Sequence, residues 1–157
     1  MNLENLKQML EKTASEVPQQ TAIVLGSRKV SYRELDETSN KIANALISLG
    51  IKKGDHVALL MSRNPDWVIN CFGALKAGAV SVLLDSGAKA PELEPLLRET
   101  DPKVLITEER FSPMLSSILP YVPLLKQVLE VGTDPYNRMV ASSSPASPSV
   151  DIEGEDE

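Results

Sequence analysis

Apolar side chains recur along the first 50 residues at the three-to-four-residue spacing of amphipathic helices. This spacing predicts a first helix that has Asn2 as its cap and ends at Pro18. It predicts a second helix from Ser31 to Gly50, because glycine readily adopts the left-handed conformation that ends helices. Ser31 and Glu34 have the spacing of a capping box, in which each side chain bonds the amide of the other residue.

Short apolar runs that are bounded by turn residues predict strands. The runs are residues 21–25, 57–61, 79–84 and 104–107, and residues 126–131 are predicted as a last strand. Residues 21–25 and 28–30 flank Gly26 and predict a hairpin. The unbroken character of the later runs is typical of strands that are covered on both faces.

Helical patterns separate the later strands. A helix is predicted from an Asn64 cap to Gly78, with Pro65 at its first position, and its predicted buried side consists of Trp67, Val68, Cys71, Phe72 and Leu75. Further helices are predicted at residues 91–98 and 112–119. This alternation predicts the α/β class: a partial doubly wound, mainly parallel sheet with flanking helices, preceded by a helix and a small hairpin.

The character of the sequence changes near its end. Residues 142–149 contain only Ser, Pro and Ala, and an acidic stretch follows. Such a segment offers few apolar side chains to offset the entropy lost on ordering. We therefore expect one folded unit over residues 1–140 and a flexible Ser/Pro-rich and acidic linker over residues 141–157.

Charge is concentrated in that last stretch. The chain of 157 residues has a formal net charge of −6, and five of its 22 acidic residues lie after residue 150. The nearly neutral remainder has no cluster of Lys and Arg, which argues against binding to nucleic acid or to an anionic membrane. No segment has the about 20 consecutive apolar residues of a transmembrane helix. We expect a cytoplasmic protein.

Few side chains qualify as catalytic groups. His56 is the only histidine and Cys71 the only cysteine, so neither a Ser-His-Asp triad with a spare base nor a Cys/His zinc site can be assembled from them. His56 lies at the start of an apolar strand and Cys71 on the predicted buried side of a helix. We expect a structural role for both.

Nucleotide-binding signatures are also missing. The chain contains neither the GxxxxGK[ST] nor the GxGxxG pattern of phosphate-binding loops. Asp85, at a strand end, could hold a ribose hydroxyl, and Arg63, beside a helix start, could hold an anion, but solvated or paired roles are expected for both. We interpret the polar residues of the helix at 91–98 as its solvent face: Glu92, Glu94, Arg98 and Glu99. The sequence therefore predicts no catalytic, cofactor-binding or metal-binding residue.

The order of several short motifs is more specific than any single motif. Residues 30–35, VSYREL, resemble the L-[TS]-Y-x-E-L core motif of the adenylate-forming superfamily. Residues 75–85, LKAGAVSVLLD, resemble its L-K-A-G-x-A-x-V-P motif, and residues 49–59, LGIKKGDHVAL, lie between the two as in that superfamily. Residues 64–68 resemble the start of its next helix. The resemblance covers about residues 1–131 and favours the fatty-acyl and aryl-CoA ligases, with peptide-synthetase adenylation domains sharing the same opening.

The resemblance implies a function for a longer parent protein. Such ligases activate a carboxylic acid with ATP and Mg²⁺ to an acyl adenylate and then transfer the acyl group to CoA. Their phosphate-binding loop and catalytic lysine follow the region that is similar here, so we expect no catalysis from this chain alone. The expected partners are the remainder of the ligase, or a second copy through an open sheet edge.

Two departures and two alternatives accompany this interpretation. Leu83 stands where the superfamily has proline, and residues 85–87 replace its usual polar Asn-Pro turn. The first alternative is a standalone interaction or regulatory module without catalysis. The second, a dinucleotide-binding domain, lacks the required glycines and is the weakest.

Overall fold

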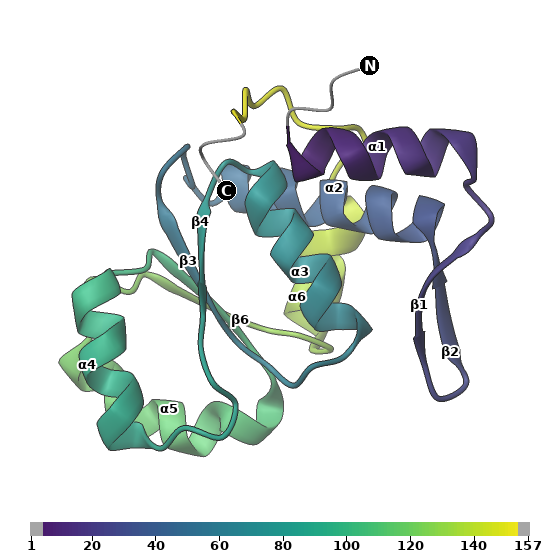
Figure 1. Ribbon diagram of the computed structural model, residues 1–157. Helices are drawn as coiled ribbons and strands as arrows, with labels where there is room; N and C mark the ends of the chain where they lie inside the picture. Colours follow the sequence, from purple (N-terminus) through teal and green to yellow (C-terminus); the bar gives the residue numbers. More distant parts are fainter. Residues whose placement is uncertain (1–4, 154–157) are drawn as a thin grey trace.

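The structure is a computed structural model that describes residues 5–153. The helices and strands alternate in the predicted order (Figure 1), together with two 3₁₀ turns, Glu109–Phe111 and Leu119–Tyr121. The elements are α1 (Leu6–Glu16), β1 (Thr21–Leu25), β2 (Arg28–Ser31), α2 (Tyr32–Ser48), β3 (His56–Leu60), α3 (Pro65–Lys76), β4 (Val80–Leu83), α4 (Ala90–Thr100), β5 (Val104–Thr107), α5 (Ser112–Ile118), β6 (Gln127–Glu130) and α6 (Asp134–Ser142).

Four of the strands form one parallel sheet in the order β4-β3-β5-β6. Val57 of β3 lies opposite Ser81 of β4 on one side and Val104 of β5 on the other. The remaining strands, β1 and β2, form a separate antiparallel hairpin at one end of the molecule (Figure 1). The predicted α/β class, parallel sheet and hairpin are confirmed.

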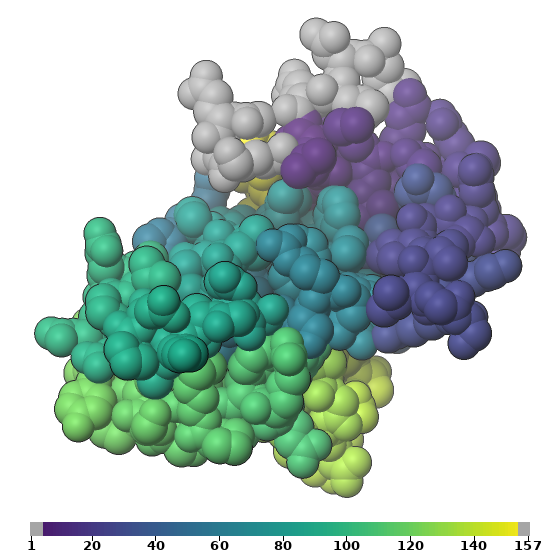
Figure 2. Space-filling view, turned by 60° about the horizontal axis from the view of Figure 1, so that its bottom comes forward, coloured from purple at the N-terminus to yellow at the C-terminus, as the bar shows by residue number. Residues whose placement is uncertain are grey.

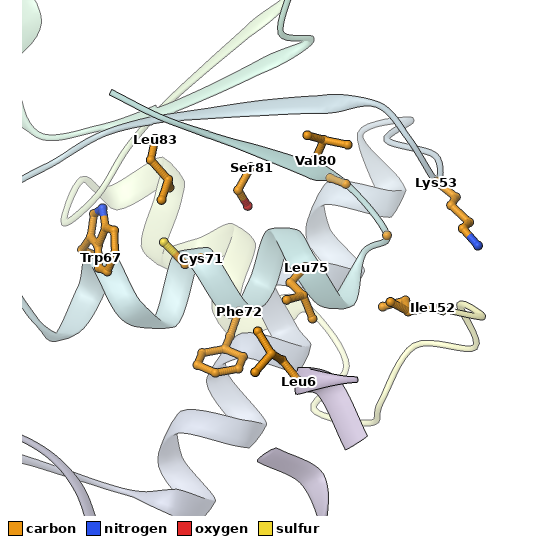
Figure 3. A pocket seen from close by; sticks show the side chains of 12 residues that line it. Leu6, Lys53, Trp67, Cys71, Phe72, Leu75, Val80, Ser81, Leu83 and Ile152 are labelled. Atoms are coloured by element: carbon orange, nitrogen blue, oxygen red, sulfur yellow. The ribbon is translucent and has the colours of Figure 1, made fainter. Parts of the chain in front are cut away.

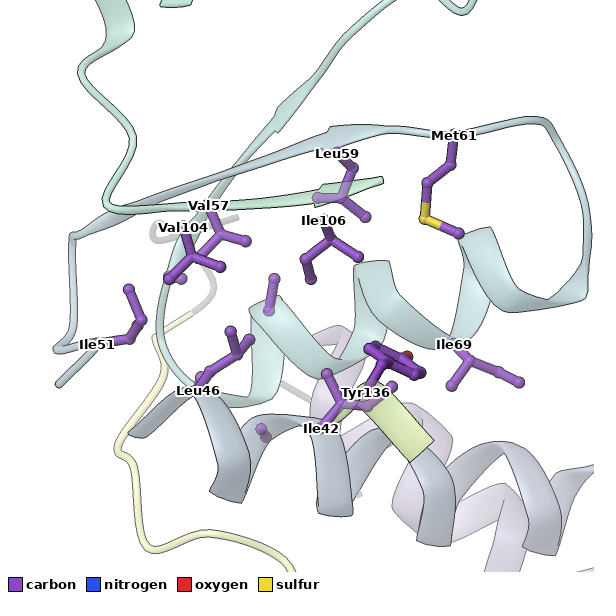
Figure 4. Packing of buried hydrophobic residues seen from close by; sticks show 14 of the residues in the cluster. Ile42, Leu46, Ile51, Val57, Leu59, Met61, Ile69, Val104, Ile106 and Tyr136 are labelled. Atoms are coloured by element: carbon purple, nitrogen blue, oxygen red, sulfur yellow. The ribbon is translucent and has the colours of Figure 1, made fainter. Parts of the chain in front are cut away.

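Helices cover both faces of the parallel sheet. On one face α2, α3 and α6 pack against β3 and β5, and Ile42, Leu46, Val57, Leu59 and Ile106 lie in this cluster (Figure 4). On the other face α4 and α5 cover a second cluster that includes Ala58 and Leu105. Successive β3 residues point to opposite faces, which is why the apolar run at 57–61 has no polar alternation. In the space-filling view the α4–α5 layer and the hairpin lie at opposite ends, with α3 residues between them (Figure 2).

Helix ends follow the predicted chemistry in most places. The Asn64 side chain accepts from the Trp67 amide at 2.9 Å, and the Ser31 hydroxyl accepts from the Glu34 amide at 3.2 Å. Gly50 and Gly78 have φ of +94° and +75°, as helix-ending glycines require. The predicted cap at Asn2 lies outside the described residues, and α1 is capped instead by Asn5, whose side chain accepts from the Gln8 amide.

The most buried side of α3 differs from the prediction. Trp67, Val68, Cys71, Phe72 and Leu75 are only partly buried, whereas Ile69, Gly73, Ala74 and Lys76 are buried. The reason is the close approach of α2, because a Cβ at Gly73 would lie 2.4 Å from Ile42 Cγ2. A residue without a side chain is therefore needed at position 73, where α2 and α3 are closest, and Trp67, Phe72 and Leu75 lie on the flank of α3.

Lys76 is the least expected member of this interface. The sequence suggests a cation that faces the carboxyl end of α3, but the Lys76 side chain is fully buried. Its Nζ lies 2.5 Å from Asp36 Oδ1 and 2.7 Å from Asn40 Oδ1, both on α2. Burial lowers the pKa of Lys76, and the hydrogen bond and charge of Asp36 oppose that shift. The ammonium group therefore joins α2 to α3.

The Ser/Pro-rich end of the chain does not leave the folded body. The predicted boundary at residue 140 falls inside α6, which continues to Ser142. Residues 143–153, here called the C-terminal strap, run back along α1 and α2 (Figure 1). The strap carbonyls accept hydrogen bonds from four side chains: Asn5 bonds Ile152, Lys7 bonds Pro148 and Val150, Asn40 bonds Pro145, and Asn44 bonds Ser144 and Ala146. These bonds attach the strap to α1 and α2, and the flexibility expected of residues 141–157 stays a prediction.

Two further features complete the fold. Helix α6, which the apolar pattern did not predict, is held on α3 by a hydrogen bond from the Tyr136 hydroxyl to Asn70 Oδ1 at 3.0 Å. Among residues 5–153, no helix is both long and apolar enough to cross a membrane.

Candidate functional site at the carboxyl end of the sheet

The sheet topology points to one place where a ligand could bind. From β3 the chain crosses through α3 to β4, whereas from β5 it continues in the opposite direction to β6. Such a change of direction opens a crevice between the carboxyl ends of the two strands, and open α/β sheets bind ligands there. In this chain the crevice lies between the ends of β3 and β5.

The side chain of Glu108, the residue after β5, binds residues that follow β3. Its Oε2 accepts from the Ser62 hydroxyl at 2.7 Å and from the Ser62 amide at 3.2 Å. Its Oε1 accepts from the side-chain amide of Asn64 at 2.8 Å, and Arg110 lies 3.3 Å away. Burial by itself would raise the pKa of Glu108, but these hydrogen bonds from Ser62 and Asn64, with the Arg110 charge, lower it overall.

The arrangement has a clear chemical consequence. A backbone amide, a hydroxyl and an amide nitrogen at the ends of parallel strands are the donors that an anionic ligand would use. Here they already bind a carboxylate of the same chain. A phosphate placed at this crevice would meet a negative charge instead of free donors, so the crevice between β3 and β5 does not fit a nucleotide.

Sequence reasoning missed this cluster, although the sequence carries a signal for it. Glu108 follows a buried strand directly, and Ser62 and Asn64 follow the neighbouring buried strand. Carboxyl ends of parallel strands meet at one edge of a sheet, so these side chains can be expected to approach each other. The strand order, which makes β3 and β5 neighbours, does not follow from the sequence pattern.

The two candidate ligand-binding residues make other contacts. The Arg63 guanidinium lies over the Trp67 ring, 4.4 Å from its centroid. Asp85 is exposed, and its Oδ1 accepts from the Gly87 amide at 2.8 Å, which closes a local turn. Both roles are local, and neither residue takes part in the Glu108 cluster.

His56 and Cys71 lie elsewhere. His56, at the amino end of β3, places Nδ1 against the carbonyl oxygen of Thr100, far along the strand from the Glu108 cluster. Cys71 is partly buried, and burial raises the pKa of its thiol to about 11, so the reactive thiolate is scarce at neutral pH. Cys71 packs against the core cluster, as expected of a structural residue, and it also lines a groove, so its burial is only partial.

The predicted solvent face of α4 is confirmed in part by its contacts. Glu92 accepts from the Lys89 amide at 2.8 Å at the start of the helix, and Glu94 pairs with Arg98 at 3.6 Å.

Within residues 5–153, no three His, Cys, Asp or Glu side chains are grouped as metal ligands. The expectations that the chain has no catalytic, cofactor-binding or metal-binding residue stay predictions.

An apolar groove lies on the other side of α3 from α2. We call it the β4 groove, and it has a volume of about 390 Å³ (Figure 3). It is lined by Leu6, Lys53, Trp67, Cys71, Phe72, Leu75, Gly78, Ala79, Val80, Ser81, Leu83 and Ile152. The flank of α3 forms one wall and β4 the other, and Ile152 of the strap closes one end.

Comparison with known proteins gives consistent matches. Residues 10–156 match the family described as AMP-binding enzyme. The chain is 32% identical, over 85% of its length, to the medium/long-chain-fatty-acid–CoA/3-oxocholest-4-en-26-oate–CoA ligase of Mycolicibacterium smegmatis, and spans 25% of that protein. It is also 36% identical over 100 residues, 64% of its length, to the phosphinothricin tripeptide synthetase PhsC of Streptomyces viridochromogenes and spans 9% of it.

The fold has solved counterparts of the same kind. The anthranilate CoA ligase AuaEII, solved in complex with anthranoyl-AMP, superposes with a TM-score of 0.91 at 28% identity. The alignment covers 99% of this chain and 31% of that ligase. The chain thus spans only about a quarter to a third of the ligases that it resembles.

Proposed function

Because the chain belongs to the AMP-binding enzyme family, we propose that it is the N-terminal part of an AMP-forming acyl-CoA ligase. In the parent reaction a carboxylate attacks the α-phosphorus of ATP, which releases pyrophosphate and forms an acyl adenylate. The thiol of CoA then displaces AMP to give the thioester. A fatty or aromatic acid is the proposed substrate class, because the similar ligases act on such acids by name.

One observation carries the proposal: the family match spans nearly the whole chain, while the chain spans only a quarter of the matched ligase. The resembling motifs act as scaffold in the structure. Residues 30–35 start α2, and residues 75–85 end α3 and form β4. These elements form the sheet and its covering helices. The Glu108 cluster has no free hydrogen-bond donors for a triphosphate.

ATP, Mg²⁺ and CoA therefore belong, in this proposal, to the remainder of the ligase. Two observations support this placement: Glu108 already binds the donors of Ser62 and Asn64 at the strand ends, and no three acidic side chains are grouped within residues 5–153. The chain alone is proposed to be inactive. We also propose that the parent works in the cytoplasm in fatty-acid metabolism.

A chimera tests the proposal. This chain would replace the matched N-terminal quarter of the Mycolicibacterium smegmatis ligase, and formation of acyl-CoA from ATP, CoA and a medium-chain fatty acid would be measured. We expect activity from the chimera and none from the 157-residue chain. A matched chimera that carries Gly73→Leu, which cannot pack against Ile42, should be inactive.

Two results would contradict the proposal. The first is a folded, monodisperse chimera without activity. The second is micromolar binding of MgATP to the chain alone in isothermal titration calorimetry, or acyl adenylate formed by it. A stable complex of the chain with an unrelated protein, without ligase activity, would favour the alternative of a standalone interaction module.

A further inference from the structure

We propose that Ser147 is a phosphorylation site for a proline-directed serine/threonine kinase, and that its phosphate releases the C-terminal strap from α1. This inference goes beyond the proposed function and does not depend on it. In the reaction, Ser147 Oγ attacks the γ-phosphorus of ATP and the bond from this phosphorus to its bridging oxygen breaks. ADP leaves, and the hydroxyl proton passes to the catalytic base of the kinase.

Sequence and exposure select two candidate serines. Three serines are followed directly by proline: Ser112, Ser144 and Ser147. Proline has no amide N–H, so a kinase that recognises it needs no acceptor at that position. Ser112 is the first residue of α5 and is only partly exposed. Ser144 and Ser147 are exposed and lie in the strap, outside any helix or strand, where a kinase can bind the chain in extended form.

The hydroxyl contacts distinguish these two serines. The Ser147 hydroxyl donates to Oε1 of Glu11, a partly buried residue of α1. The Ser144 hydroxyl instead accepts from the Ala146 amide at 3.1 Å, within the strap. A phosphate on Ser147 removes the donor and faces a carboxylate, whereas a phosphate on Ser144 can still accept from the amide. Only phosphorylation of Ser147 therefore sets like charges against each other between the strap and α1.

The charged groups around Ser147 decide the response of the strap. A phosphoserine has a charge of about −2 at neutral pH. Lys7, one turn before Glu11 on α1, donates from Nζ to the carbonyl oxygens of Pro148 at 2.9 Å and Val150 at 3.1 Å. If Lys7 turns to the phosphate, these two bonds are lost. If it stays, the phosphate and Glu11 repel each other, so both responses weaken the attachment of the strap.

Local opening gives the kinase access to the site. Asn40 and Asn44 of α2 also donate to strap carbonyl groups, so the strap must detach before a kinase can enclose Ser147. Of residues 143–149 only Pro148 is buried. Their detachment exposes little apolar surface and requires less free energy than global unfolding. The phosphate then stabilises the detached strap relative to the attached one.

Phosphorylation in vitro tests the site. The 157-residue chain would be incubated with MgATP and a purified proline-directed kinase of the mitogen-activated class, and phosphoserines would be located by mass spectrometry. We expect a phosphate on Ser147 that is absent from Ser147→Ala. In a Ser112→Ala/Ser144→Ala chain, which keeps one Ser-Pro site, phosphorylation should speed amide exchange at Val150 at least about tenfold.

Matched variants separate charge repulsion from the added volume of the phosphate. In Glu11→Gln, the new side-chain amide can donate to the phosphate, so phosphorylation should change exchange at Val150 by less than about twofold. Glu16→Gln, at the exposed end of the same helix, should keep the full acceleration. A Ser112→Ala/Ser147→Ala chain that is phosphorylated on Ser144 should show no faster exchange.

Each part of the inference can be overturned separately. A chain that stays unmodified at Ser147 while a peptide of residues 142–152 reacts would reject the accessible site, and an unreactive peptide would reject the kinase class. Unchanged or slower exchange after modification, as a stable pair of phosphate and Lys7 would give, would reject strap release. Equal acceleration in Glu11→Gln would reject the role of Glu11. None of these measurements uses ligase activity, so an inactive chimera would leave them unaffected.

Discussion

Single residues show that the structural role of a polar side chain in this protein is set by its neighbours in space. Lys76 and Glu108 look like surface charges in the sequence, yet both sit in hydrogen-bond networks that join separate elements. The sequence predicts helix caps well, because a cap such as Asn64 acts within three residues of its own position. It could not predict the partners of Lys76, since the pairing depends on the angle at which α2 meets α3.

At this scale, Asp36→Ala is expected to destabilise the protein by about 3 kcal/mol, because it leaves the buried Lys76 charge without its partner. Urea unfolding followed by circular dichroism measures the loss. The neighbouring Glu37→Ala, on the exposed side of the same helix, should change the unfolding free energy by less than about 0.5 kcal/mol. Equal effects of the two substitutions would mean that the ion pair contributes nothing.

Glu108 gives a prediction that depends on pH. Its pKa in the folded protein lies below the ordinary value of 4.5, so its carboxylate adds stability above that value, and this stability is lost as the pH falls through the folded pKa. Glu108→Gln should cost about 1–3 kcal/mol at pH 7. The difference from the native chain should shrink below about pH 4. The exposed Glu109→Gln is the control, and a difference that does not vary with pH contradicts the assignment.

Elements depend on contacts that composition does not reveal. The strap illustrates this: Ser, Pro and Ala offer little to bury, but side chains of α1 and α2 donate hydrogen bonds to its carbonyl groups. Composition describes side chains, whereas these bonds use the backbone, so composition could not predict that residues 143–153 contact α1 and α2. The apolar run of β4 predicts a strand. It does not predict that β4 is an edge strand of the sheet, because strand order depends on contacts between distant segments.

The strap is expected to detach more often when a side chain that donates hydrogen bonds to its carbonyl groups is replaced by one that cannot donate. Asn44 Nδ2 lies 3.0 Å from the Ser144 carbonyl oxygen and 2.9 Å from that of Ala146. Asn44→Asp replaces this donor by a carboxylate that faces two carbonyl oxygens, so we expect at least about tenfold faster amide exchange at Val150 and Ala146, an effect of about 1.4 kcal/mol. Lys41→Glu, also on α2, is a control of charge alone. Unchanged exchange in the Asn44 variant would show that the strap is held by other contacts.

At the scale of the whole molecule, the described residues form two separate sheets. The parallel sheet and the general order of its elements could be predicted, because buried strands and amphipathic helices alternate clearly. The strand order, and therefore the approach of Glu108 to Ser62 and Asn64, could not. The hairpin stands apart from the parallel sheet, tied to α3 by the Arg28–Asp66 pair at 2.8 Å, and its Val24 and Leu25 are 60% and 52% exposed.

This exposure predicts self-association of the isolated chain. A two-stranded hairpin with uncovered apolar side chains is marginal alone and tends to gain further strands. Sedimentation velocity should show oligomers that grow with concentration and that diminish in a Val24→Lys/Leu25→Lys variant. Leu124→Lys, at a similarly exposed leucine away from either sheet, should have little effect. A single monomer peak at all concentrations would contradict this prediction.

The bond between Asn5 and the Ile152 carbonyl joins residues 147 positions apart in the chain. During synthesis on the ribosome, Asn5 therefore emerges 147 residues before the strap residue that it binds. Until then the apolar contact of Val150 with Gly78 is absent, and the place of Ile152 in the β4 groove is empty. Ribosome-bound intermediates of this domain should therefore recruit chaperones until about the last residues of the strap have left the exit tunnel.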